Sequence, residues 1–213
     1  MSGIEALTLR SDDATTLEAE LARPDGAPRV GVVLCHPHPQ YGGTMRSIVI
    51  SALFEALPKI GVETLRFNFR GVEHSTGDFD EGHGERRDAR AAVDALANDL
   101  GPNTPLVLVG WSFGADIALS VRDRSVRAWV AIAPPLRYAT DLDGIAVDKR
   151  EKVLILAEHD EYRPAEEVAA LAAAWTNTAV EVVGGASHFF VGRTDRVTQL
   201  TAAFVDTLVP AAS

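Results

Sequence analysis

Short runs of aliphatic residues alternate along the chain with longer stretches in which apolar residues recur at helical spacing. The first pattern predicts buried strands, and the second predicts amphipathic helices. We expect strands at residues 4–10, 15–22, 29–35, 62–69, 105–110, 126–133, 152–157 and 179–184. We expect helices at residues 45–61, 85–101, 113–123, 164–175 and 194–209, the first of them stopped near Pro58 and Gly61.

This order of elements predicts an α/β fold. A turn-rich segment, residues 11–14, joins the first two strands, and from the third strand onward strands and helices mostly alternate. Parallel strands joined by helices form right-handed crossovers, so the central sheet should be mostly parallel with helices on both faces. The 213-residue chain shows no internal repeat, linker or low-complexity segment, and we expect residues 1–213 to form a single domain.

Composition and charge narrow the classes of partner. The chain is 46% hydrophobic and 23% charged, with a formal net charge of −10 that is spread along it. This balance argues against nucleic acid or an anionic membrane as the main partner and leaves small neutral substrates open. The chain shows no signal-peptide pattern and no apolar run long enough to span a bilayer, and its single cysteine cannot form an intramolecular disulfide. We therefore expect a cytoplasmic protein.

One serine stands at a tight corner of the predicted fold. The stretch "GWSFG", with Ser112 at its centre, matches the G-x-S-x-G pattern of a nucleophile elbow. It follows a predicted strand and precedes a predicted helix, so the serine oxygen should lie at the carboxyl edge of the sheet, where ligands bind in open α/β folds. Because chance can also produce so short a pattern, this order of strand, turn and helix is what favours Ser112 as a nucleophile.

A nucleophilic serine needs a base and a carboxylate that orients the base. His188, in "GASHFF", follows the last predicted strand and is the best of six histidines for the base. Asp160 follows the preceding strand, and its short side chain suits the reach to a histidine on the neighbouring loop; Glu158 and Glu161 are rivals for this position. The chain order Ser112, Asp160, His188 is an order expected when a nucleophile elbow stands in an α/β fold.

Acyl transfer at a serine also needs donors for an oxyanion. One donor should be the backbone N–H of Phe113, the residue after the nucleophile, and the other should come from the loop after the strand that ends at Cys35. The two prolines of that loop have no amide proton, so His38 is the natural donor, with Gln40 and Tyr41 next. Gln40 and Tyr41 are also candidates for the wall of a substrate pocket.

Other residues near these motifs have structural interpretations. His36 and His38 could share a metal ion, but no third ligand stands at a useful spacing, and we expect no metal and a structural His36. Arg70 is expected to form an ion pair with a nearby carboxylate rather than bind substrate. Trp111 and Phe189 flank the predicted catalytic positions, where they should pack in the core or line an acyl pocket.

Several longer stretches carry a family resemblance. The segments "CHPHPQYGGTM", "LRFNFRGVEHSTGDFDEGHGE", "GWSFGA", "HDE" and "GASHFF" resemble those of the α/β-hydrolase superfamily, in its small cap-less branch related to dienelactone hydrolases. The resemblance covers nearly the whole chain and implies the α/β-hydrolase fold without a cap domain. Glu158 and Glu73 depart from residues common in relatives, and these differences bear on substrate preference.

Together, these features predict a serine carboxylesterase that cleaves short-chain acyl esters through Ser112, His188 and Asp160 and an acyl-enzyme. The segment of residues 134–151 is too short for a lid, so the site should be shallow and open. No cofactor is implied; the partner would be a small ester, and the protein a monomer or homodimer. Thioester hydrolysis and a dienelactone-hydrolase-like reaction remain alternatives, as does a non-catalytic binding protein on the same fold.

Overall fold

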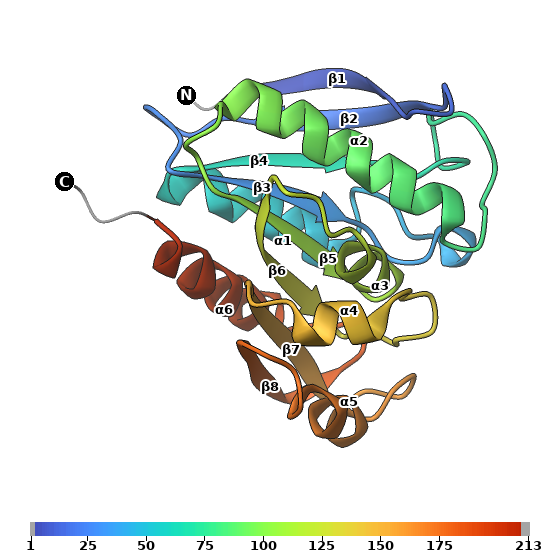
Figure 1. The fold of residues 1–213 in the computed structure, drawn as a ribbon, viewed down its shortest axis with the longest axis vertical. Coiled ribbons are helices and arrows are strands. Elements are labelled where there is room, and N and C mark those ends of the chain that lie inside the picture. Colours follow the sequence, from blue (N-terminus) through green and yellow to red (C-terminus); the bar gives the residue numbers. More distant parts are fainter. Residues whose placement is uncertain (1–2, 210–213) are drawn as a thin grey trace.

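A computed structural model describes residues 3–209 and contains one eight-stranded sheet with the strand order β1-β2-β4-β3-β5-β6-β7-β8 (Figure 1). Strand β2 pairs antiparallel with both β1 and β4, and all pairs from β4 across to β8 are parallel. The strands are β1 Ile4–Arg10, β2 Thr16–Ala22, β3 Val30–Cys35, β4 Val62–Phe67, β5 Leu106–Trp111, β6 Val126–Ile132, β7 Glu151–His159 and β8 Thr178–Ser187.

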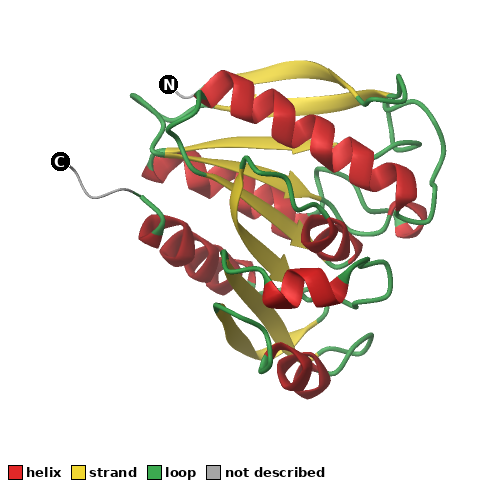
Figure 2. Cartoon of the chain, in the orientation of Figure 1, coloured by secondary structure: helices red, strands yellow, loops and turns green. Residues whose placement is uncertain are grey.

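Helices cover both faces of this sheet (Figure 2). Helices α2 to α5 contribute to the hydrophobic core on one face, and α1 and α6 to the core on the other. The helices are α1 Ile48–Ala56, α2 His83–Leu100, α3 Phe113–Ser120, α4 Leu142–Val147, α5 Ala165–Ala172 and α6 Thr194–Thr207, with short 3₁₀ turns η1 Pro39–Tyr41 and η2 Leu57–Ile60. The predicted mostly parallel sheet with helices on both faces is confirmed.

Burial follows from this layering. Every residue of the central strands β3, β4 and β5 is buried, because helices lie above and below them. This explains why β3 and β5 read as continuous aliphatic runs rather than as alternating patterns. Strand β4 is buried as well, although Glu63, Thr64 and Arg66 interrupt its apolar residues. The β1–β2 hairpin lies at the sheet edge and is partly exposed, and buried and partly exposed residues alternate along β2. This is typical of antiparallel strands that have one face in contact with solvent.

Several elements differ from the sequence expectations, most clearly α1, α4, β7 and β8. The predicted helix at 45–61 is the shorter α1 followed by η2, because Pro58 begins a tighter turn and Gly61 closes it at φ 86°. Helix α4 lies within residues 134–151, where we expected only a loop. Strands β7 and β8 run beyond the predicted 157 and 184, which carries their ends closer to the site.

Between β6 and β7 the chain forms only α4 and its loops, so no cap covers the carboxyl edge of the sheet. None of the helices within residues 3–209 is long and apolar enough to cross a membrane. The ends of the expected domain, residues 1–2 and 210–213, lie outside the described residues.

Candidate active site

Ser112 occupies the sharp turn between β5 and α3. Its backbone has φ 56° and ψ −122°, a combination that non-glycine residues rarely adopt and that costs on the order of 1–3 kcal/mol. The flanking glycines make this turn possible, because a Cβ at Gly110 would overlap the backbone of Gly114. A Cβ at Gly114 would in turn overlap the carbonyl oxygen of Cys35 on the neighbouring strand. The G-x-S-x-G spacing is therefore a requirement of close backbone packing.

His188 lies directly opposite Ser112. The Nε2 atom of His188 is 2.8 Å from the Ser112 Oγ atom, and the imidazole is buried with its residue 5% exposed. The histidine is the first residue after β8, and the indole N–H of Trp111 donates a 3.2 Å hydrogen bond to its carbonyl oxygen. The residue before the nucleophile thus fixes the backbone of the histidine loop.

Asp160 completes a continuous chain of hydrogen bonds. Its Oδ2 atom is 2.8 Å from Nδ1 of His188, and its other oxygen accepts the amide N–H groups of Tyr162 and Arg163 at 2.9 and 3.1 Å. Because an ionised carboxylate only accepts, Nδ1 must carry the imidazole proton, which leaves Nε2 as an acceptor for the Ser112 hydroxyl. The geometry is that of a serine activated by an oriented base.

The two rival glutamates make other contacts. Glu158 accepts the amide N–H of Gly185 at 2.6 Å, and its half-exposed side chain does not reach the imidazole. Glu161 accepts the amide N–H of His188 at 3.2 Å. Both carboxylates therefore hold the backbone of the histidine loop, whereas Asp160 meets the ring.

Two amide groups beside Ser112 are free to bind an oxyanion. Among the described residues, neither the amide N–H of Phe113 nor that of His38 donates a hydrogen bond. The other two candidates are engaged, because the Gln40 amide donates to Nδ1 of His38 at 3.2 Å and the Tyr41 amide donates to the His38 carbonyl oxygen at 3.1 Å. The geometry therefore favours the pair that the sequence ranks first.

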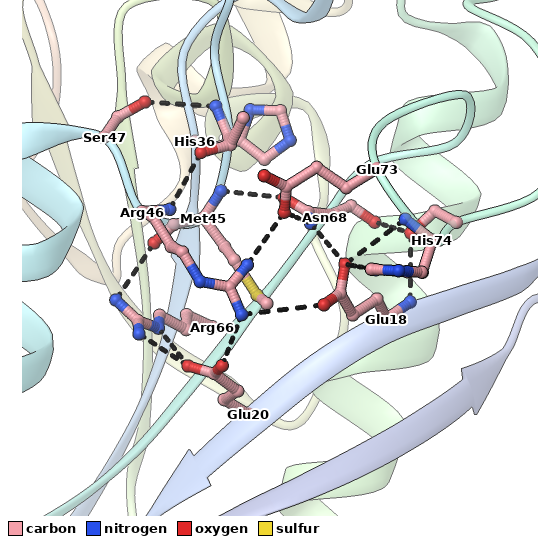
Figure 3. A network of polar contacts seen from close by, with 12 residues as sticks. Glu18, Glu20, His36, Met45, Arg46, Ser47, Arg66, Asn68, Glu73 and His74 are labelled. Carbon is pink, nitrogen blue, oxygen red and sulfur yellow. Dashed lines mark hydrogen bonds and ion pairs between the residues drawn. The ribbon is translucent and has the colours of Figure 1, made fainter.

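The loop of residues 36–47, which carries His38, is held in place by contacts with Asn68 and Phe69, the two residues that directly follow β4. Figure 3 shows the polar network around Asn68. Asn68 is fully buried, and its side-chain oxygen accepts the Met45 amide N–H at 2.8 Å. The Asn68 amide group donates to Glu18 and Glu73, at 2.7 Å each, and the Arg66 guanidinium donates to the Met45 carbonyl oxygen. The same network includes Glu20, Arg46 and His74.

His36 anchors the other end of this loop. Its Nδ1–H donates to the Pro37 carbonyl oxygen at 2.6 Å, and its Nε2 accepts the Phe69 amide N–H at 3.0 Å. Burial lowers the pKa of His36 to about 3, so the ring is neutral. Both ring nitrogens are engaged, and within residues 3–209 no group of three His, Cys, Asp or Glu side chains is placed to hold a metal. His36 has the structural role that the sequence favoured.

Two further structural interpretations match the geometry. Arg70 is buried and forms hydrogen-bonded ion pairs with Asp88 at 2.7 Å and Asp13 at 3.0 Å. Cys35 is fully buried at the end of β3, and burial raises the pKa of its thiol far above the usual range. A thiol held in its neutral form at such a site is a poor second nucleophile.

A pocket of about 480 Å³ opens over Ser112 and His188. Three of the four expected pocket residues line it, namely Tyr41, Trp111 and Phe189. Gln40 does not line the pocket: it lies exposed in the turn η1, and this differs from our expectation. Sequence reasoning missed further members of the wall, among them Gly43, Ile48, Pro135, Arg137, Tyr138 and Tyr162.

Solved structures with this fold establish the family. An α/β serine hydrolase homologue from Coxiella burnetii is 33% identical, with a TM-score of 0.86, over 96% of this chain and 98% of that one. The chain belongs to the α/β serine hydrolase family. A family member from Xanthomonas campestris, described as lacking a lid, is 27% identical, with a TM-score of 0.87, and the match covers 100% of this α/β serine hydrolase and 98% of the other protein.

At the level of sequence, an uncharacterised protein of Rickettsia prowazekii is 32% identical over 173 residues, which are 76% of this chain and 73% of that protein. No family model matches the chain. The resemblance to the cap-less branch of the α/β-hydrolases is confirmed by the structural matches, and the general class of the protein is that of a hydrolase.

Proposed function

We propose that this hydrolase is a serine carboxylesterase that cleaves short-chain acyl esters. The observation that carries the proposal is the hydrogen-bonded series Ser112, His188, Asp160, with 2.8 Å at each step, beside two unpaired amide donors. Nucleophile, base, orienting carboxylate and oxyanion donors are the groups that acyl transfer at a serine requires.

In the first half of the reaction, the Ser112 oxygen attacks the ester carbonyl while its proton moves to Nε2 of His188. The carbonyl oxygen becomes an oxyanion that accepts hydrogen bonds from the Phe113 and His38 amides. Asp160 holds the ring and stabilises the imidazolium. His188 then returns the proton to the leaving alcohol as the C–O bond breaks, which leaves an acyl-enzyme at Ser112.

In the second half, water replaces the alcohol. His188 takes a proton from the water, whose oxygen attacks the acyl carbon through the same oxyanion geometry. Collapse of this intermediate transfers the proton back to Ser112 and releases the carboxylic acid. These steps need only side chains and backbone amides of one chain, so we propose that the protein acts as a single domain on a small ester and without a cofactor.

The preference for short acyl chains rests on the form of the pocket. Its volume of about 480 Å³ lies at the small end of ligand sites, and no cap extends its walls. The aromatic side chains of Trp111, Phe113 and Tyr138 restrict the space beside the nucleophile. Acyl groups of a few carbons fit between them, whereas longer chains would extend into solvent and gain little from binding.

The test is a series of p-nitrophenyl esters of increasing acyl length, assayed with wild-type protein and with Ser112→Ala, and a serine-directed organophosphonate. We expect turnover that falls beyond short chains, no turnover by the variant, and a phosphonate adduct at Ser112 by mass spectrometry. Turnover of the matched thioesters in preference to esters would shift the function to a thioesterase. Absence of both turnover and adduct would leave a binding protein on a hydrolase fold.

A further inference from the structure

The wall of the pocket that follows β6 carries polar groups that the proposed ester hydrolysis does not use. Pro135, Arg137 and Tyr138 line it, and Asp116 of helix α3 fixes this segment: its fully buried carboxylate accepts the amide N–H groups of Leu136, Arg137 and Tyr138 at 2.8–2.9 Å. Because α3 begins directly after Ser112, the same helix positions the nucleophile and this wall. The backbone that carries the side chains at 137 and 138 is therefore held in place relative to the reacting serine.

Arg137 gives this pocket a charge opposite to that of the protein. The formal net charge of the chain is −10, yet no Asp, Glu or Lys is among the described residues that line the pocket, and Arg137 is the only arginine. Within the part of the chain that the structure describes, its guanidinium forms no ion pair and donates no hydrogen bond. Other arginines near the site, such as Arg66 and Arg70, are paired with carboxylates.

The hydroxyl group of Tyr138 provides a second donor. This follows from the tautomer of His38, which sets the direction of the hydrogen bond between the two side chains. Nδ1 of His38 accepts the Gln40 amide N–H, and burial lowers the pKa of the ring, so the neutral imidazole carries its proton on Nε2. Nε2–H therefore donates to the Tyr138 oxygen at 3.0 Å. The phenolic proton is left to donate elsewhere, and no acceptor for it lies among the described residues.

The positive charge of Arg137 also acts on the phenol group of Tyr138. Burial raises the pKa of Tyr138, and the nearby guanidinium works against that shift. The carboxylates of Glu81 and Asp116 act on the same phenol, but neither lines the pocket or pairs with Arg137, and Asp116 is occupied by the three amides. Two donors that have no protein acceptor among the described residues, one of them cationic and exposed, thus lie in the pocket wall.

We propose that Arg137 and Tyr138 form a subsite for an anionic group of the substrate, so that the preferred esters carry a carboxylate a few bonds from the scissile carbonyl. A guanidinium and a neutral hydroxyl donor together match the two oxygens of a carboxylate. This inference rests on the proposed esterase function and adds the substrate class. A carboxylate bound there would be fixed relative to Ser112 through α3, which orients the ester for attack.

The test compares two esters of nearly equal shape, monoethyl succinate and ethyl levulinate, which differ in that a methyl group replaces the charged oxygen. Ethanol release gives kcat/KM for each. We expect the wild-type protein to prefer the succinate ester by at least about tenfold at low salt, because the charge-assisted bond is made only with the anion. Added salt should reduce the preference.

Variants assign the preference to its residues. Arg137→Gln should remove it, and Tyr138→Phe should reduce it several-fold. Arg124→Gln is the matched control, because Arg124 is exposed, has no ion pair among the described residues and lies outside the pocket; it should keep the wild-type ratio. An unchanged ratio in Arg137→Gln would overturn the subsite, and an unchanged ratio in Tyr138→Phe alone would overturn the part assigned to the hydroxyl.

The proposed function and this inference fail in different ways. If p-nitrophenyl butyrate and both ethyl esters are all left intact, the esterase proposal fails, and the subsite as a specificity determinant fails with it. If the neutral esters are hydrolysed but monoethyl succinate and ethyl levulinate inhibit p-nitrophenyl butyrate hydrolysis equally, the esterase stands and the anionic subsite is refuted. Stronger inhibition by monoethyl succinate, lost in Arg137→Gln, supports both.

Discussion

Two loops face each other across Ser112, and they serve the site with different chemistry. The loop of residues 36–47, here the oxyanion loop, is held at both ends by the buried residues that directly follow β4 and offers a backbone amide. The loop that follows β8, the base loop, is held by Trp111 and by two glutamates and offers an imidazole. Side-chain replacement should therefore damage the base loop far more than the oxyanion loop.

The largest loss of activity is expected from a change at Ser112, which lies between the two loops. Ser112→Ala should lower kcat by about 10⁴-fold or more, because nucleophile, base and oxyanion donors act as a unit. The fold should persist, since the substitution removes one oxygen and keeps the flanking glycines. Steady-state kinetics with p-nitrophenyl butyrate and a circular dichroism spectrum measure the two quantities. Near-wild-type activity in a folded variant would refute the assignment of Ser112.

For the imidazole of the base loop, the side chain that orients it from the end of β7 should decide the rate. Asp160→Asn should reduce kcat/KM by at least about 10²-fold, because the amide no longer holds the imidazole in the tautomer that leaves Nε2 unprotonated. Glu158→Gln is the matched control: it removes a charge of the same sign from the same segment, and its loss should be smaller because Glu158 meets only a backbone amide. The reverse order would transfer the orienting role to Glu158.

On the oxyanion loop, the backbone should matter and the ring should not. His38→Pro deletes the amide donor and should cost roughly 3 kcal/mol of transition-state stabilisation, about a hundredfold in kcat. His38→Ala keeps the amide and should cost much less with a neutral ester. Equal and severe losses in both variants would show that the imidazole itself takes part, and the contrast between the two loops would then be wrong.

The smallest effect on activity is expected from a change at the buried carboxylate of Asp116, where the measurable effect is on the free energy of unfolding. Burial raises its pKa from 3.8 to about 6, against the opposing effect of its amide hydrogen bonds. Between these values the folded protein binds a proton that the unfolded chain has released, so the contribution of this group to stability is lost as pH rises through the window. The shift corresponds to about 3 kcal/mol.

Urea unfolding of the wild-type protein and of Asp116→Asn, from pH 4 to pH 7, isolates this contribution. We expect the unfolding free energy of the variant to rise, relative to that of the wild-type protein, as pH increases through the window. Asp94→Asn offers a matched control on a half-exposed carboxylate, and the change with pH should be smaller there. Parallel curves for the wild-type protein and Asp116→Asn would mean that Asp116 titrates equally in both states.

Local signals in the sequence account for much of the fold. The positions of the strands could be predicted from runs of apolar residues, although β7 and β8 end beyond the predicted residues 157 and 184. Ser112, Asp160 and His188 each follow such a strand in chain order. Helix α4 was missed because it has six residues, of which Ile145 alone is buried, too few for a helical period to show. The candidate oxyanion donors could be ranked from the sequence only because the two prolines of the loop after β3 have no backbone N–H to donate.

Contacts between distant segments account for most of what was missed. Little near Asn68 in the sequence shows that its amide lies between Met45 and two glutamates, since Glu73 alone is close in the sequence, whereas Met45 and Glu18 come from another loop and another strand. The approach of Tyr138 to His38 likewise joins residues that are a hundred positions apart. Gln40 was expected in the pocket because it neighbours Tyr41, but successive residues of the turn η1 point to different sides.

The missing side chain of Gly114 sets the width of the site. Because a Cβ there would overlap the Cys35 carbonyl, the start of α3 rests against the strand that leads into the oxyanion loop with no side chain between the two backbones. The spacing of the Phe113 and His38 amides thus depends on this direct contact between main chains, in addition to the side-chain contacts of Asn68 and His36 that hold the loop. An alanine at this one position would separate the two donors by about the size of a methyl group. Variants of this enzyme with new substrates should therefore be sought in the aromatic and charged wall around Arg137, while residue 114 stays glycine.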